Sequence, residues 1–130
     1  MSMYSYPLDE NLVRELEDSC YAGPMIDEDG LRLLNEEEVA RIDKMSIQIQ
    51  SDEHPPPHFH VIFSGQNASF SIVDGTRLRG VKGLERFEKN IRKWWKEHRC
   101  DLILGWNRLR PSDCSVGPLV VPPECLKLPS

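Results

Sequence analysis

The chain has 130 residues and no long apolar run, since its longest wholly apolar stretches are only a few residues. A transmembrane helix is therefore not expected. The first ten residues contain neither the basic region nor the apolar core of a secretory signal, which predicts a cytoplasmic location. The four cysteines form no CxxC pair, and this pattern favours reduced thiols over a disulfide or a zinc site.

Several catalytic signatures are also missing. The sequence contains no nucleophile elbow around a serine or cysteine and no glycine-rich phosphate loop, so triad chemistry and nucleotide hydrolysis lack support. The HExxH zinc motif is absent as well. Hydrophobic residues make up 39% and charged residues 28% of the chain, which is ordinary for one globular domain.

Charge is distributed unevenly although the net charge is only −5. Residues 1–53 contain fourteen acidic and four basic residues, whereas residues 54–130 contain seven acidic and twelve basic ones. Such a division is typical of an acidic arm that lies on, or competes for, a basic face. An acidic solvated helix beside a basic one explains the same pattern.

The most distinctive pattern is the run HPPPHFH at residues 54–60, which holds three of the four histidines. Three consecutive prolines predict a stiff, extended lead-in. The aromatic and β-branched residues that follow predict a strand over residues 58–63. Because side chains alternate along a strand, we expect His58 and His60 on one face and Phe59 on the other, with His54 nearby on the lead-in.

Periodicity predicts the remaining elements in the first part of the chain. A helix is expected over residues 8–20 with Asp9 as its N-cap, and a short helix over residues 35–43. Two further strands are expected over residues 45–50 and 68–73. The segment 52–57 joins the first to the histidine strand, and a hairpin turn at residues 64–67 joins the second. The pair Asp74-Gly75 predicts a hairpin into a short edge strand over residues 76–79.

The strongest helical pattern extends from Lys82 to about Cys100. Its apolar stripe has spacings of three and four and consists of Leu84, Phe87, Ile91, Trp94, Trp95 and His98. Residues 102–106 either continue this helix or form a second short one, and the proline-rich residues after Pro111 are expected to be extended. The fold class is thus α+β: N-terminal helices and an antiparallel three- to four-stranded meander, with one long amphipathic helix packed on it.

The HPPPHFHV run and its surroundings resemble the bacterial family called domain of unknown function 4160. The matching features are the alternating strand before the run, Ile72 with Asp74-Gly75, a tryptophan at 94 or 95, and the segment from Leu102 to Asn107. The resemblance implies a core domain at residues 40–110, between an acidic helical extension at 1–39 and a proline-rich tail at 111–130. It implies little about activity, but genes of the family resemble members of toxin–antitoxin-like pairs, so a small protein encoded nearby is the expected partner.

Three interpretations of the histidines remain open. They are structural, or they act as general acid and base on a phosphodiester with nearby Arg or Lys, or they bind a divalent metal. The catalytic candidates are His54, His58 and His60, and Asp52 joins the same three as a candidate metal ligand.

The basic helix is a candidate surface for a partner or a nucleic acid, because cations interleaved with aromatic residues can follow a phosphate backbone. The candidate residues are Arg77, Arg79, Arg86, Lys89, Arg92, Lys93, Trp95 and Lys96. The alternative is that Trp94 packs on the sheet, Trp95 covers the helix flank, and the cations are solvated.

Two functions follow from these patterns. We favour a non-enzymatic partner-binding protein of a toxin–antitoxin-like or immunity-like pair. The alternative is a small metal-assisted or histidine-based enzyme that acts on nucleic acid, similar to a ribonuclease. A membrane partner is not expected, and the sequence predicts no oligomeric state.

Overall fold

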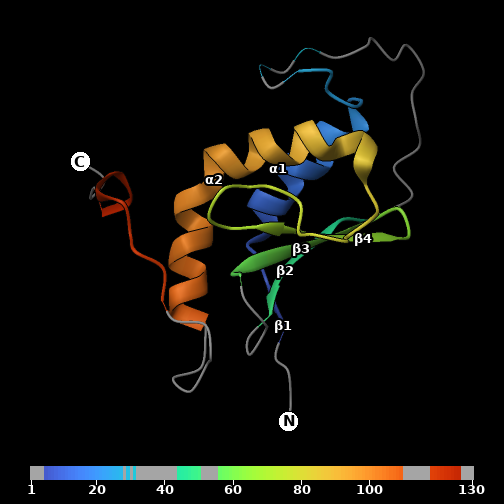
Figure 1. Ribbon diagram of the computed structural model, residues 1–130. Coiled ribbons are helices and arrows are strands. Elements are labelled where there is room, and N and C mark those ends of the chain that lie inside the picture. Colours follow the sequence, from blue (N-terminus) through green and yellow to red (C-terminus); the bar gives the residue numbers. More distant parts are fainter. Residues whose placement is uncertain are drawn as a thin grey trace.

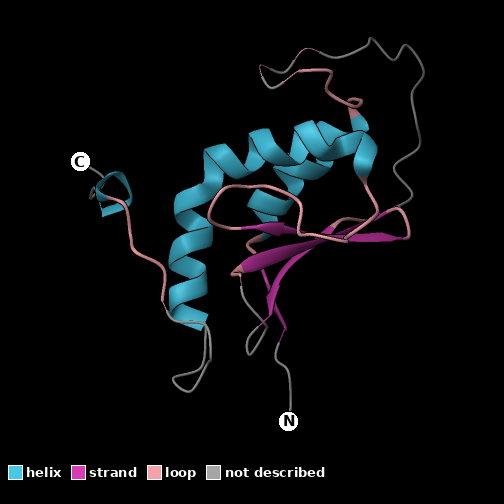
Figure 2. Cartoon of the chain, in the orientation of Figure 1, coloured by secondary structure: helices cyan, strands magenta, loops and turns pink. Residues whose placement is uncertain are grey.

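A four-stranded antiparallel sheet is covered on one face by two helices, in the computed structural model of the chain (Figures 1 and 2). The structure describes residues 5–27, 29, 31, 44–50, 56–109 and 118–126. This two-layer arrangement confirms the predicted α+β class. The helix predicted over residues 35–43 lies outside the described residues.

The strands follow the sheet in chain order and every neighbouring pair is antiparallel. Their bounds are β1 (Ser5–Pro7), β2 (Ser46–Gln50), β3 (His58–Phe63) and β4 (Gln66–Ser71). The expected meander is formed by β2, β3 and β4, and alternation along β2 buries Met45, Ile47 and Ile49 as predicted. The short strand β1 was not predicted, because three residues that include a proline give no periodic signal.

The turns differ from the prediction in length. Ser64 and Gly65 form a two-residue hairpin with φ of 53° and 74°, so β4 begins two residues earlier than expected. The hairpin predicted at Asp74-Gly75 returns the chain along β4, since the Ser71 amide donates to the Thr76 carbonyl and the Leu78 amide to the Ser69 carbonyl. The edge strand predicted over residues 76–79 is wrong in extent, because the pairing is a single bridge between Arg77 and Phe70. Within the turn, the Asp74 carboxylate accepts hydrogen bonds from the Thr76 amide and hydroxyl. These bonds also hold the pKa of Asp74 below its usual value.

Helix α1 (Glu10–Tyr21) begins where the sequence predicts it, because the Asp9 side chain accepts a hydrogen bond from the Asn11 amide at 2.8 Å. Its end is tied to the second helix by Asn90, which is 1% exposed. The Asn90 amide group donates to the Gly23 carbonyl at 3.1 Å and accepts from the Met25 amide at 2.8 Å. The turn after α1 therefore lies directly on the second helix.

The second helix begins with a 3₁₀ turn, η1 (Glu85–Phe87), and continues as α2 (Glu88–Leu109). It extends through the segment 102–106, so the two alternatives left open by the sequence resolve into one helix with a kink. The kink lies at His98, whose φ of −119° and ψ of 19° are not helical. Beyond it, the helix turns down beside the strand ends (Figure 1).

The core lies between the sheet and the two helices. Trp94 is 4% exposed, and its ring centroid lies 5.7 Å from that of Phe59 on β3. Its indole nitrogen donates to the Leu12 carbonyl of α1 at 2.8 Å. The neighbouring Trp95 is half-buried and donates to the Ile72 carbonyl at 2.7 Å. Trp94 thus packs on the sheet while Trp95 covers the flank of the helix. This packing is the predicted alternative to a binding role for the pair.

The prediction of reduced cysteines is wrong for two of the four, because Cys100 and Cys125 form a disulfide. Sequence spacing does not show that the tail returns to α2, where the Asn107 side chain makes two hydrogen bonds with the backbone of Leu119. Nor is the tail simply extended, since Pro123–Leu126 form a 3₁₀ turn, η2. Cys20 is buried and takes part in no disulfide, as expected, and Cys114 lies outside the described residues.

None of the helices within the described ranges has the length and apolarity needed to span a membrane.

Gly75 provides a test of the packing between the β4 loop and α2. Its φ is +75°, and a Cβ there would lie 2.6 Å from the Trp95 ring. Gly75→Ala should therefore lower the free energy of unfolding by about 2 kcal/mol or more, from backbone strain and overpacking together. Gly80→Ala is the matched control, because its φ is +80° and its surroundings are open. The control should lose only about 1 kcal/mol in urea unfolding, and an equal loss in both variants would contradict the packing.

The disulfide can be tested by Cys125→Ser. A bridge across a sequence separation of 25 should stabilise the fold by about 2–4 kcal/mol. The variant should lose that amount in urea unfolding, and a reductant should lower wild-type stability to the same level without changing the variant. A wild type insensitive to reductant would show that the bridge does not form.

Candidate functional site

Strand β3 places two histidines on the face of the sheet opposite the helices. The His58 and His60 ring centroids are 4.8 Å apart, which confirms that both imidazoles share one face. His58 is only 2% exposed, and its Nδ1 lies 2.7 Å from the Pro56 carbonyl oxygen. Because a carbonyl can only accept, Nδ1 carries the proton and Nε2 is the basic nitrogen in the neutral ring.

The second imidazole is held by the neighbouring strand. His60 is half-buried and pairs across the sheet with Ser69 of β4. Its Nδ1 lies 2.9 Å from the Ser69 hydroxyl oxygen. His54 and Asp52, the other candidate ligands, lie outside the described residues. In the part of the chain that the structure describes, no group of three metal-ligating side chains includes His58 or His60.

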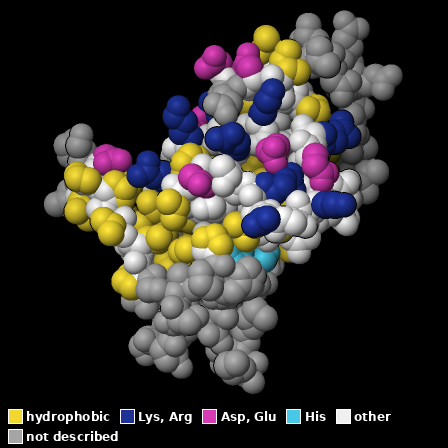
Figure 3. Space-filling model, in the orientation of Figure 1, with side chains coloured by type: hydrophobic (Ala, Val, Ile, Leu, Met, Phe, Trp, Pro, Cys, Tyr) yellow, Lys and Arg dark blue, Asp and Glu magenta, His cyan; other side chains and the backbone are white. Residues whose placement is uncertain are grey.

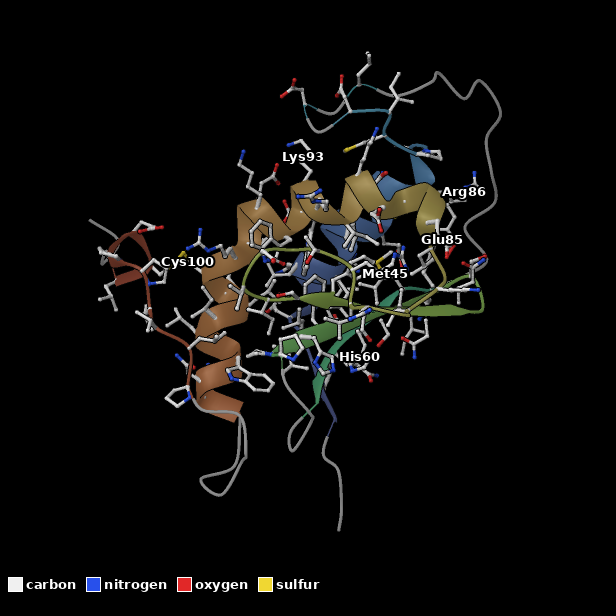
Figure 4. The ribbon with its side chains drawn as sticks, in the orientation of Figure 1. Met45, His60, Glu85, Arg86, Lys93 and Cys100 are labelled. Carbon is white, nitrogen blue, oxygen red and sulfur yellow. A yellow bond between two sulfur atoms is a disulfide. The ribbon has the colours of Figure 1, made fainter. Side chains whose placement is uncertain are left out.

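The basic helix is not beside the imidazoles. The first half of α2 packs on the face of β3 that carries Phe59, because alternation sends Phe59 and the histidines to opposite sides. Figure 4 shows His60 on one side of the sheet and Lys93 on the far side of α2. The cations on this half of the helix are therefore not placed to stabilise charge on a substrate held by His58 and His60.

Half of the predicted binding residues lie in one cleft on the outer surface of α2. The cleft has a volume of about 360 Å³. We call it the basic cleft, and it is lined by Arg92, Lys93, Trp95, Lys96, Arg99 and Asp29. Figure 3 shows lysine and arginine side chains gathered over the helix layer, with the histidines at its lower edge.

Arg99 was not among the predicted residues, although its spacing could have identified it. Positions 92, 96 and 99 are separated by four and three residues and so share one face of a helix. The presence of Asp29 in the cleft could not be predicted from the sequence, since it depends on the chain after α1 folding back onto α2. The Lys89 ammonium group donates to the Ile26 carbonyl at 2.6 Å and holds this returning segment near the cleft.

The other predicted cations are placed elsewhere. Arg77 is largely buried against Phe70, donates to the Gly83 carbonyl at 2.7 Å and pairs with Glu88 at the same distance. These contacts give it a structural role at the start of α2. Arg86 lies over the Phe87 ring, and Arg79 is exposed on the loop before the helix.

Carboxylates from both ends of the chain approach the basic cleft. Asp29 lines it from the acidic N-terminal part, and Glu124 lies 3.9 Å from Arg99 at its rim. The Cys100–Cys125 disulfide fixes the position of Glu124, because it joins the adjacent residues of the two segments. The cleft is thus an electropositive recess that already attracts carboxylates.

Residues 45–107 match a family model described as Domain of unknown function (DUF4160). This part of the chain belongs to that family. The DUF4160 domain contains β2, β3, β4 and α2, and hence both the histidine face and five of the six residues of the basic cleft. The match lies inside the range 40–110 expected from the sequence. No curated protein and no solved structure matches the chain.

His58 should contribute more to stability than His60. Replacing a 2% exposed ring that hydrogen-bonds to Pro56 leaves a cavity and a carbonyl without its donor. His58→Ala should lower the free energy of unfolding by about 2–4 kcal/mol. His60→Ala, at a half-buried position, should lower it by about 1 kcal/mol. Urea unfolding of both variants measures this difference, and the reverse order would contradict the placement of the two rings.

Proposed function

We propose that this protein is a non-enzymatic binding protein that uses the basic cleft to hold acidic side chains of a partner protein. The observation that carries the proposal is the cleft itself, in which Arg92, Lys93, Lys96 and Arg99 surround one recess. Among the described residues that line it, Asp29 is the one acidic residue. Four cations around one recess attract an anionic partner and accelerate its association.

The contacts at the cleft give a precedent for binding carboxylates. Asp29 lines the recess and Glu124 pairs with Arg99, so the chain's own acidic groups already lie at its margins. A partner that presents Asp and Glu side chains would extend these contacts. Trp95 forms one wall, and its hydrogen bond to Ile72 and its contact with the Gly75 backbone hold the ring in place. A fixed aromatic wall limits the entropy lost on binding.

The partner that we propose is a small acidic protein encoded by an adjacent gene, as in toxin–antitoxin-like or immunity-like pairs. A cytoplasmic location is still a prediction. The Cys100–Cys125 disulfide weighs against this location, because disulfides persist mainly in oxidising compartments and are rare in the cytosol.

A second candidate is an enzyme that acts on nucleic acid through the histidine face. The observation in its favour is the pair of imidazoles at 4.8 Å, with the protonated nitrogen of His58 fixed by the Pro56 carbonyl. A histidine whose second nitrogen donates to a carbonyl is oriented as a base or as a metal ligand. Against it stand the burial of His58 and the position of the basic helix on the opposite face.

Charge reversal in the cleft tests the binding function. The double variant Arg92→Glu/Lys96→Glu should weaken binding of the adjacent gene product at least tenfold, because two attractive contacts become repulsive. The matched control is Arg14→Glu/Arg108→Glu, which makes the same charge change at exposed positions outside the cleft. The control should bind nearly as tightly as the wild type. Isothermal titration at two salt concentrations gives the dissociation constants, and added salt should weaken the wild-type complex.

The titration and a parallel RNA assay together separate the two candidate functions. If the gene product does not bind, or if both double variants lose affinity equally, the cleft is not the binding surface. The second assay measures cleavage of a labelled single-stranded RNA by the wild type and by His60→Gln. RNA cleavage that is lost in His60→Gln would favour the second candidate over the first.

A further inference from the structure

Three metal-ligating side chains meet where α1 crosses the kink of α2. They are Glu15 from α1 with Glu97 and His98 from α2, and one ligand atom from each lies within 4.8 Å of the other two. The closest pair is His98 Nε2 and Glu15 Oε2, at 2.6 Å. This cluster shares no residue with the histidine face or with the lining of the basic cleft.

The kink of α2 lies at one of the three residues. Adjacent residues on a regular helix point about 100° apart. The φ and ψ of His98 are not helical, so α2 departs from this regular geometry at the position where Glu97 and His98 both approach Glu15. No proline or glycine occurs between residues 94 and 102 to explain the kink.

The imidazole is oriented like that of a metal ligand. Its ring is packed against Trp94 at 5.5 Å between centroids, and its side chain is 15% exposed. The second ring nitrogen, Nδ1, lies 3.6 Å from Asp101 Oδ2, just beyond hydrogen-bond distance. A small rotation of Asp101 would bring this carboxylate into hydrogen-bond contact, as with the outer carboxylates that orient metal-binding histidines.

We propose that Glu15, Glu97 and His98 bind a divalent transition-metal ion of the zinc type, with Asp101 as the outer carboxylate. One imidazole nitrogen and two carboxylate oxygens suit zinc, whereas magnesium and calcium prefer oxygen alone. Tetrahedral zinc with bonds of about 2.0–2.2 Å places its ligand atoms roughly 3–4 Å apart. The cluster therefore needs only small side-chain rotations to close around an ion.

The charges at the cluster also favour a cation. Glu15, Glu97 and Asp101 lie near one imidazole, and Lys93 pairs with Glu97. A carboxylate has two oxygens, so Glu97 can pair with Lys93 through one oxygen and bind a metal ion through the other. The competing explanation is a protonated His98 that bridges Glu15 and Asp101 without a metal.

Zinc titration of the chelator-treated full chain, with its disulfide intact, tests the site. Isothermal titration should show one equivalent of Zn²⁺ bound and a higher melting temperature with zinc present. Glu15→Gln should weaken binding at least tenfold without disturbing the fold, because Glu15 is exposed. Asp101→Asn should weaken it about tenfold through the orientation of His98.

Glu10→Gln is the matched control, since it neutralises another exposed carboxylate of α1 outside the cluster. It should bind zinc as the wild type does. Absence of saturable binding overturns the proposal and leaves the ion bridge through protonated His98. Binding of equal affinity in the wild type and Glu15→Gln also overturns it, because the ion would then lie at other histidines or at a thiol.

Discussion

The packing of Trp94 joins the sheet to both helices, and the remaining structure depends on this contact. The ring lies against Phe59 of β3, and its nitrogen donates to the Leu12 carbonyl of α1. Trp95 continues the attachment through the Ile72 carbonyl and the Gly75 backbone. With both indoles anchored to the domain, the polar face of α2 is directed outward. The basic cleft is thus a consequence of how the tryptophans are buried.

The packing of Trp94 on Phe59 also separates the histidine run of β3 from the basic residues of α2. Alternation along β3 directs Phe59 towards Trp94 and the imidazoles to the other face. The histidines therefore lie away from the cations on the first half of α2. The proline lead-in does position the rings, because the Pro56 carbonyl accepts from His58. This arrangement stabilises a buried imidazole, which is consistent with a structural contribution from the motif.

Local patterns predicted most of the fold. Alternation defined β2 and β3, helical spacing defined α1 and α2, and Asp9 marked the start of α1 because capping is a local interaction. The features that the sequence did not reveal depend on contacts between distant segments. The strand β1 pairs with β2 only after α1 has returned the chain, and the Cys100–Cys125 bridge depends on where the tail lies.

The candidate sites show the same limit. Arg92, Lys93, Trp95 and Lys96 were identifiable from one helix, whereas Asp29 enters the cleft from another segment. The cluster at the kink was not predicted, because Glu15 and His98 are far apart in sequence and the kink has no proline or glycine to mark it. A ligand set that combines residues from two elements can be identified only once the packing of those elements is known.

The most direct test of the binding surface is an NMR titration of the ¹⁵N-labelled protein with the product of the adjacent gene. If the basic cleft is the binding surface, the largest shift changes will fall on the backbone amides of residues 92–99 and on the indole N–H of Trp95. Changes centred instead on the amides of His58, His60 and Ser69, with the α2 signals unmoved, would contradict binding at the cleft.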